Sequence, residues 1–303
     1  MVRYLWIFVL AVLAAGCAND ARRGVPSPGV AERRAVAFLI REVPAWSTDN
    51  QCFSCHNNGD AARALYVASR KGHRIPATAL ADTTAWLSKP DQWKNNKGDP
   101  GFSDQRLANL QFAAALLVAI ETGHIKDKQP IQSAAALVAH DQAPDGSWPV
   151  EPANPIGSPA TYGTTLATYT GWRILHESRA AEWLQKQKAN HVPAAAATLL
   201  QFAGNKLALE FLVRAQATDG GWGPYLDSPT EPFDTALALL ALAKHRDQPG
   251  ISARIQAGRK YLAAQQQPDG GWPATTRPPR GESYAQRIST TAWATLALLE
   301  TRD

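Results

Sequence analysis

The chain has 303 residues, 45% of them hydrophobic, so it can bury a sizeable core as one large domain or two small ones. Its formal net charge of +5 is small and is spread along the chain. Nucleic-acid-binding proteins concentrate basic residues in one patch, and this sequence has no such block, so we expect no nucleic-acid partner.

The first residues are typical of a secretion signal. Arg3 supplies a positive charge, residues 4–15 form an uninterrupted apolar run, and small residues then lead to Cys17. The run is short for a membrane-spanning helix. An ordinary cleaved signal and an uncleaved anchor are both compatible with this layout.

Residues 13–17, Leu-Ala-Ala-Gly-Cys, resemble the lipobox of bacterial lipoproteins, although Ala14 stands where that motif usually has leucine. The resemblance implies that Cys17 becomes the first mature residue and carries lipid, which would hold the protein to a membrane. In such lipoproteins an aspartate after the cysteine marks the inner membrane, and this chain has Ala18. We therefore expect a periplasmic protein that is anchored to the outer membrane.

Three segments follow from this reading. Residues 1–17 form the signal and the lipid-anchor cysteine. Residues 18–34 are rich in proline, glycine and small residues and lack apolar periodicity, so they are expected to form a flexible tether. The ordered body is expected over residues 35–303.

The body repeats a unit of an amphipathic helix, a short turn and a more apolar helix. The clearest turns are residues 142–148, 216–222 and 266–272, each with glutamine six positions before tryptophan and an Asp-Gly pair between them. Asp-Gly permits a tight turn with positive φ, and we expect the tryptophan to be buried over the junction. An amphipathic helix faces solvent on one side, so the first helix of each unit should be outer and the second inner. Weaker copies extend the pattern to six hairpins, with turn markers at Cys55, Phe102, Trp148, His191, Trp222 and Trp272.

The pattern Gln-x-x-Asp-Gly-(Gly/Ser)-Trp resembles the QW repeats of squalene–hopene and oxidosqualene cyclases, whose architecture the β subunits of protein prenyltransferases share. The resemblance covers residues 35–303. It implies an all-α fold, an α/α toroid of about six helical hairpins around a central cavity. It says little about chemistry, because one fold hosts many functions.

The sharpest chemical motif is Cys52-x-x-Cys55-His56. Two thiols at this spacing can form thioether bonds to one haem c while His56 binds the iron. With Cys17 lipidated, this assignment uses all three cysteines of the chain. The alternative is a disulfide between Cys52 and Cys55, with His56 capping the next helix. A zinc site is disfavoured because the sequence has no second Cys/His pair.

The second iron ligand cannot be methionine, because Met1 is the only methionine and is removed with the signal. A second histidine, another donor such as lysine or tyrosine, or an open position remains. The haem loop joins an outer helix to an inner one, and His191 begins an inner helix at the same end of the toroid. His191 is therefore the leading candidate for the distal ligand of the iron.

Two activities of the resembling families depend on residues that this chain lacks. Squalene–hopene cyclases use an Asp-x-Asp-Asp-Thr-Ala motif whose middle aspartate protonates the alkene. In the matching residues 231–236, Phe233 stands in the place of that acid, and only Asp234 and the Thr-Ala pair remain. Prenyltransferases need a zinc site that includes a cysteine, and both cysteines after the signal belong to the haem motif. We therefore expect neither activity.

Three functions remain open. The first, which we expect, is a membrane-anchored monohaem cytochrome that exchanges electrons with a periplasmic redox partner, the toroid serving as scaffold. The second is a haem enzyme that oxidises an apolar, isoprenoid-like small molecule in the toroid cavity. The third is a non-redox binding lipoprotein with a Cys52–Cys55 disulfide.

Overall fold

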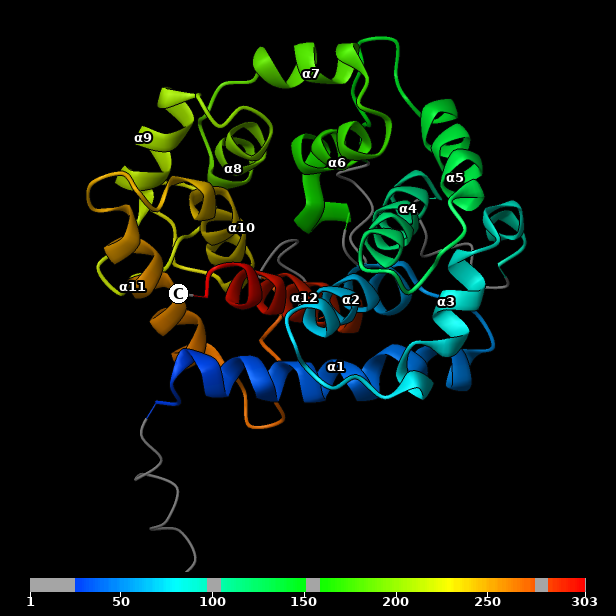
Figure 1. The fold of residues 1–303 in the computed structure, drawn as a ribbon. Helices are drawn as coiled ribbons and strands as arrows, with labels where there is room; N and C mark the ends of the chain where they lie inside the picture. The colour runs from blue at the N-terminus through cyan, green and yellow to red at the C-terminus, as the bar shows by residue number, and fades with distance from the viewer. Residues whose placement is uncertain (1–24, 97–104, 151–158, 276–282, 303) are drawn as a thin grey trace, which may run out of the picture.

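The computed structural model consists of two concentric rings of helices (Figure 1), and it describes residues 25–96, 105–150, 159–275 and 283–302. These ranges contain no strand. The outer helices are α1 (Pro28–Asn50), α3 (Ala81–Leu87), α5 (Gln129–His140), α7 (Ser178–Gln185), α9 (Lys206–Ala215) and α11 (Ile251–Gln265). The inner helices are α2 (Ala62–Arg70), α4 (Gln105–Glu121), α6 (Pro159–Leu175), α8 (Val192–Gln201), α10 (Pro232–Leu242) and α12 (Tyr284–Glu300). Outer and inner helices alternate along the chain, which confirms the predicted α/α toroid of helical hairpins.

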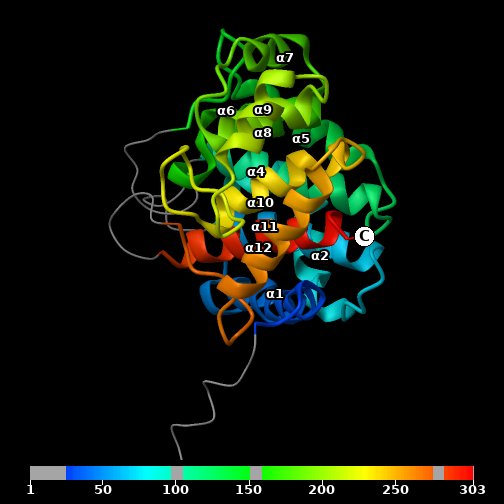
Figure 2. The same cartoon turned by 90° about the vertical axis from the view of Figure 1, so that its left-hand side faces the viewer.

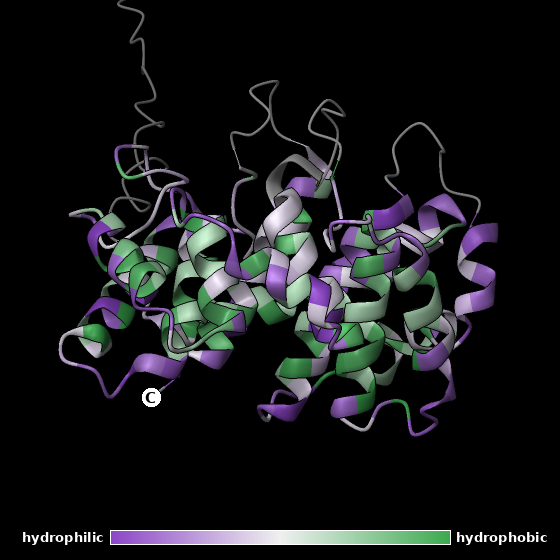
Figure 3. Cartoon of the chain, turned by 90° about the horizontal axis from the view of Figure 1, so that it is seen from above, coloured by the Kyte–Doolittle hydropathy of each residue, from purple (hydrophilic) through white to green (hydrophobic). Residues whose placement is uncertain are grey.

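Burial separates the two rings as the hydrophobic pattern predicted. The outer helix α9 buries one face, formed by Ala208, Phe211, Leu212 and Ala215. Nearly every residue of the inner helix α10 is buried. In Figure 3 hydrophilic residues gather on the periphery and hydrophobic residues lie inside. The core therefore lies between the rings and within the inner ring.

The three Asp-Gly turns share one geometry. Each turn tryptophan is fully buried, and its indole N–H donates at 2.8 Å to a carbonyl oxygen in or at the end of the outer helix before it. Its backbone N–H donates to a threonine hydroxyl of the inner helix after it, at 2.9 to 3.1 Å. The acceptors are Val138 and Thr168 for Trp148, Leu212 and Thr235 for Trp222, and Leu262 and Thr291 for Trp272. One side chain thus fastens both helices of its hairpin.

The glycine of each turn touches the next outer helix. Gly146, Gly220 and Gly270 have φ values of 94°, 88° and 100°. A Cβ atom on any of them would lie 2.5 to 2.8 Å from a carbonyl oxygen of α7, α11 or α1. Only glycine combines this φ with so close an approach, so the turns also join neighbouring hairpins.

The last turn packs on the first helix and closes the ring (Figure 2). Gln266 Nε2 donates to the carbonyl oxygen of Ala31 at 2.7 Å, and Arg34 donates to the carbonyls of Gln267 and Pro268. Helix α1 therefore begins at Pro28. This corrects the expected boundary, because residues 28–34 of the predicted tether are helical and are held by the far end of the chain.

A second contact fastens the C-terminus to the same helix. Glu32 is buried, its Oε1 lies 2.9 Å from His73 Nε2, and its Oε2 accepts from Arg302 Nε at 2.9 Å. Burial raises the pKa of Glu32, but the hydrogen bonds from Arg302 and His73 outweigh it, so the net shift is downward from 4.5. Glu32 is thus a carboxylate that links both ends of the described chain.

None of the described helices is long and apolar enough to cross a membrane. Residues 1–24, with the expected signal and Cys17, lie outside the described residues. The lipid anchor and the expected localisation stay predictions.

Candidate active site

The Cys-x-x-Cys-His motif lies where α1 leads into the first inner helix. Ser54 caps the π-helix η1 (Cys55–Ala61), because its Oγ accepts from the Asn57 N–H at 3.0 Å and its own N–H donates to Asn58 Oδ1 at 2.9 Å. η1 continues directly into α2. π-Helical turns are rare and occur often at functional sites, so this segment is the first place to search.

His56 is packed between two aromatic rings. Its ring meets Trp46 and Tyr284 edge to face, with centroid distances of 4.9 and 5.7 Å. Burial lowers the pKa of His56 from 6.5 to about 3. Its Nε2 has no hydrogen-bond partner among the described residues. The imidazole is therefore neutral near pH 7 and a poor proton acceptor.

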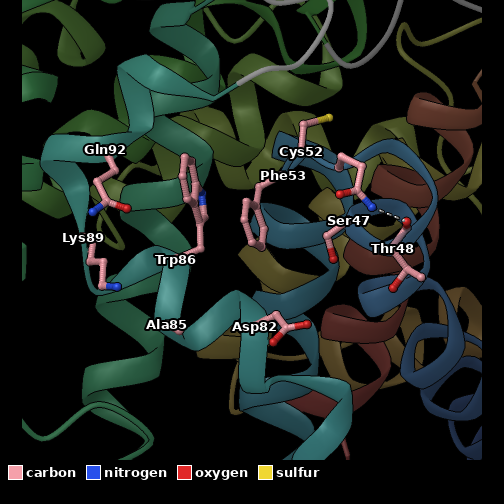
Figure 4. Close-up of a pocket in the computed structure, with 10 residues that line it drawn as sticks. Ser47, Thr48, Cys52, Phe53, Asp82, Ala85, Trp86, Lys89 and Gln92 are labelled. Atoms are coloured by element: carbon pink, nitrogen blue, oxygen red, sulfur yellow. Dashed lines mark hydrogen bonds between the residues drawn. The ribbon is translucent and has the colours of Figure 1, made fainter.

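Cys52 lines a pocket of about 400 Å³ between the end of α1, the following loop and α3 (Figure 4). Phe53 and Trp86 form one wall as a stacked pair, with ring centroids 4.5 Å apart. Cys52 is buried, Cys55 is partly exposed, and the structure has no disulfide between them. The pocket brings Cys52 together with the exposed side chains of Asp82 and Lys89.

His191 is held elsewhere. It caps α8, where its Nδ1 accepts from the Ala194 N–H at 3.1 Å, and its ring faces Tyr225. None of these neighbours is shared with His56, whose ring lies against α1 and α12. The structure therefore does not bring together the two histidines that we expected as iron ligands. A helix-capping role accounts for His191, since an acceptor in the cap position satisfies an N–H of the first turn.

Across the described ranges, no group of three or more His, Cys, Asp or Glu side chains is arranged to hold a metal ion. The described inner segments hold two fully buried aspartates, Asp60 and Asp234, and the side-chain bonds of Asp60 join three of these segments.

Asp60, in η1, is a fully buried carboxyl group at the meeting point of three inner segments. Its Oδ2 accepts from Gln111 Nε2 of α4 at 2.8 Å and from Trp293 Nε1 of α12 at 3.3 Å. Its Oδ1 has no hydrogen bond from any described residue and lies 3.5 Å from Arg63 Nη2. Burial raises the pKa of Asp60 above 3.8, and the Arg63 charge with these donors opposes that rise only in part.

The tryptophan that donates to this carboxyl group belongs to a cluster of aromatic rings. Trp293 lies at the centre of the cluster. The rings of Tyr162 in α6 and Phe233 in α10 both meet it edge to face, with centroid distances of 5.9 Å. The Arg63 guanidinium lies over the face of Trp293, 4.3 Å from the ring centroid. The π system is negative at its face, which favours this position for the guanidinium.

The residues at the start of α10, which match the cyclase motif, make packing and hydrogen-bond contacts within the fold. Phe233 is fully buried against Trp293, and Thr235 accepts the Trp222 backbone N–H like the equivalent threonines of the other turns. The Asp-Thr-Ala sequence is thus partly explained by the repeat. The position expected for a cyclase acid holds a ring, but that ring contacts the same tryptophan as Asp60 does.

Sequence reasoning missed Asp60. Its partners are 51 and 233 positions away, so no local pattern reveals them. The available signal was an acidic and a basic residue three positions apart, Asp60 and Arg63, at the start of an apolar inner helix.

No family model matches the chain. Among curated proteins it is similar to two drimenyl diphosphate synthases. The one from Streptomyces showdoensis is 28% identical over 204 residues, which is 64% of this chain and 32% of that protein. The one from Streptantibioticus cattleyicolor is 26% identical over 214 residues, 69% of this chain and 34% of that protein. The chain thus spans about a third of the length of these curated relatives.

Solved structures resemble the whole toroid. A protein from Actinoplanes has a TM-score of 0.60 at 17% identity, and the match covers 91% of this chain and 99% of that one. The type II terpene cyclase MstE from Scytonema, in complex with its product merosterolic acid A, has a TM-score of 0.59 at 18% identity, with 90% and 96% covered. A second MstE structure holds the substrate geranylgeranyl dihydroxybenzoate.

These likenesses overturn the expected function of an electron-transfer cytochrome. The similar proteins are a diphosphate synthase and a terpene cyclase, not cytochromes, and the described residues offer no metal site. A five-residue motif was outweighed by a pattern that extends over more than two hundred residues. A haem iron as the functional centre is therefore not supported. No described contact tests whether a haem is attached to Cys52 and Cys55. The repeats, the inner ring and the solved structures agree on one conclusion, that this chain has the fold of the type II terpene cyclases.

Proposed function

We propose that the protein binds an isoprenoid polyene within its inner ring and cyclises it, with Asp60 as the acid that starts the reaction. One observation carries this proposal: a fully buried carboxyl group with a raised pKa lies beside aromatic rings from three inner helices. A general acid must be protonated at the working pH, and burial keeps it so.

The geometry suits proton transfer to a carbon–carbon double bond. A proton on Asp60 Oδ1 meets no hydrogen-bond acceptor among the described residues, so it is available to a substrate alkene. The carboxylate that remains is stabilised by Arg63 and by the donors on Oδ2. The alkene gains the proton and becomes a carbocation, the next double bond attacks it and closes a ring, and loss of a proton from carbon ends the sequence. Atoms and charge balance without a redox partner.

The surroundings serve the cationic stages of this reaction. Trp293, Tyr162 and Phe233 offer π systems to a passing positive charge. All three side chains are buried, and exclusion of water protects a carbocation from premature capture. In this proposal Asp60, which lies in a different inner segment, takes the role of the acid that is absent at Phe233.

The comparisons support the substrate class. MstE is a type II terpene cyclase whose bound substrate carries a geranylgeranyl chain, and the curated relatives are drimenyl diphosphate synthases. An acyclic prenyl chain with a polar end group is therefore the substrate that we propose for this chain. The chain spans about a third of the length of the curated relatives, so the diphosphate end group in their names is only proposed for the substrate of this chain.

The test is a turnover assay in deuterated water with farnesyl and geranylgeranyl diphosphates as probes. Asp60 exchanges its proton with solvent, so each cyclised product should carry one deuterium, detected by mass spectrometry. Asp60→Asn should lower turnover by at least about 10²-fold, since it cannot donate that proton. Asp91→Asn, which alters an exposed carboxylate of η3 (Pro90–Asn95), is the matched control. Full activity in Asp60→Asn would refute the assignment.

A further inference from the structure

The Cys52–Cys55 pair has no part in the proposed cyclisation, yet it is attached to the segment that carries Asp60. Cys55 is the first residue of η1, and Asp60 lies within the same seven-residue π-helix. Phe53 and Ser54 are the only residues between the two sulfurs. Anything that moves Cys55 therefore acts on the start of η1.

The link between the cysteines and η1 is a short network of hydrogen bonds. Ser54 holds Asn57 and Asn58 by the two bonds that cap η1. Asn58 Nδ2 in turn donates to the Val43 carbonyl of α1 and to Thr83 Oγ1 of α3, at 3.2 and 2.8 Å. A change at Ser54 is thus transmitted both to the turns before Asp60 and to two outer helices.

Both sulfurs lie where a small reagent can reach. Cys52 lines the pocket of about 400 Å³, and Cys55 is partly exposed. No disulfide joins them in the structure, and a spacing of two residues closes one of the smallest disulfide loops that proteins use for reversible exchange.

We propose that Cys52 and Cys55 form a reversible dithiol–disulfide pair that controls the π-helix carrying Asp60. The oxidant is a low-molecular-weight disulfide such as oxidised glutathione. One cysteine thiolate attacks its S–S bond, forms a mixed disulfide and releases one glutathione thiol. The second cysteine attacks the protein sulfur of the mixed disulfide, forms the Cys52–Cys55 bond and releases the second. Two protein S–H bonds and one glutathione S–S bond become one protein S–S bond and two glutathione S–H bonds.

The expected structural effect is loosening of the cap. Closing the loop draws Cys55 toward Cys52 across Ser54, which strains the bonds from Ser54 to Asn57 and Asn58. The amides of residues 57–61 should then exchange with deuterated water at least tenfold faster in the disulfide form.

Thiol content is the first measurement. The full chain is equilibrated in buffers of reduced and oxidised glutathione, thiols are alkylated, and the peptide that holds both cysteines is weighed after proteolysis. We expect both alkylations to be lost together as the buffer becomes oxidising. Cys52→Ser and Cys55→Ser should each leave one sulfur that gains at most one glutathione. Retention of both alkylations in oxidised glutathione would overturn the proposal. So would a mass on this peptide that survives reduction, since both sulfurs would then be bonded otherwise.

Amide exchange is the second measurement, and it tests the coupling. The wild type is compared in its two redox forms, with α9 as an internal reference far along the ring. A double variant with serine at both positions should exchange identically in both buffers. A disulfide that forms while residues 57–61 exchange at an unchanged rate would refute control of η1. Neither readout depends on whether Asp60 protonates a substrate.

Discussion

At the scale of single residues, the surroundings of Asp60 give the strongest indication of a chemical function. It combines full burial, an adjacent guanidinium, two donors on one oxygen and none on the other. A carboxyl group that only stabilised the fold would be expected to use both oxygens, because an unsatisfied buried acceptor costs free energy. Its arrangement is better suited to holding a proton than to holding a permanent charge.

The raised pKa of Asp60 has a consequence for folding that can be measured. The unfolded chain loses this proton near pH 3.8, whereas the folded chain keeps it to higher pH. The wild type should therefore lose stability relative to Asp60→Asn as the pH rises above 3.8, by at most about 1.4 kcal/mol per pH unit. Urea unfolding of both proteins between pH 3 and 8 measures the difference, and parallel curves would show that Asp60 is not perturbed.

Sequence reasoning reached part of the candidate site at this scale. It placed Cys52 and His56 at the entry to an inner helix, because the repeat gave the position of that helix. Gln111 and Trp293 were out of reach, since their bonds to Asp60 depend on how helices from opposite ends of the chain meet. His191 was chosen because it lies at the same end of the toroid as His56. The two histidines belong to different hairpins, however, and the position of a hairpin around the ring decides which side chains meet.

At the scale of elements, the Asp-Gly turn is the repeated device. Its tryptophan fastens the two helices of one hairpin, and its glycine touches the next hairpin. Local chemistry accounts for most of this, so the three turns were predictable from short motifs alone. The start of α1 was not, because its composition resembles a tether and its contacts are with distant residues of the last turn and with Arg302.

A pair of glycine substitutions separates the two demands on the turn. Gly270 and Gly72 both have positive φ, but a Cβ on Gly270 would lie 2.5 Å from the Arg34 carbonyl oxygen, whereas one on Gly72 meets nothing within 4 Å. Gly72→Ala should cost only the left-handed strain of about 1 to 2 kcal/mol. Gly270→Ala should cost about 2 kcal/mol more, from the forced movement of α1. Chemical denaturation measures both, and equal losses would mean that the close approach is unimportant.

At the scale of the whole molecule, the ring is closed at two places on α1, by the last turn and by Arg302. A toroid buries its core only when the last hairpin meets the first. The closing contacts therefore matter to every hairpin rather than to the termini alone. Glu32 is the charged member of this closure, and its lowered pKa makes the closure sensitive to acid.

Glu32→Gln tests this sensitivity. The folded protein holds Glu32 as a carboxylate below its usual pKa of 4.5, so its stabilisation is present above that pH and is lost as the pH falls through the lower folded value. At pH 7 the substitution should cost about 1.5 to 3 kcal/mol, the range for hydrogen bonds to charged groups. The cost should shrink below pH 4.5. Glu182→Gln, on the exposed face of α7, is the control, and a cost that does not change with pH would contradict the assignment.

The contact between Glu32 and Arg302 also places the two ends of the described chain side by side. A closed ring of six similar hairpins has no geometrical first member. A chain could therefore begin at any of the six hairpins and form the same ring. Joining residue 302 to residue 28 by a short linker and opening the chain between another inner helix and the outer helix that follows it would leave every inner helix with its neighbours. The position of the chain ends is thus a property of the gene rather than of the fold.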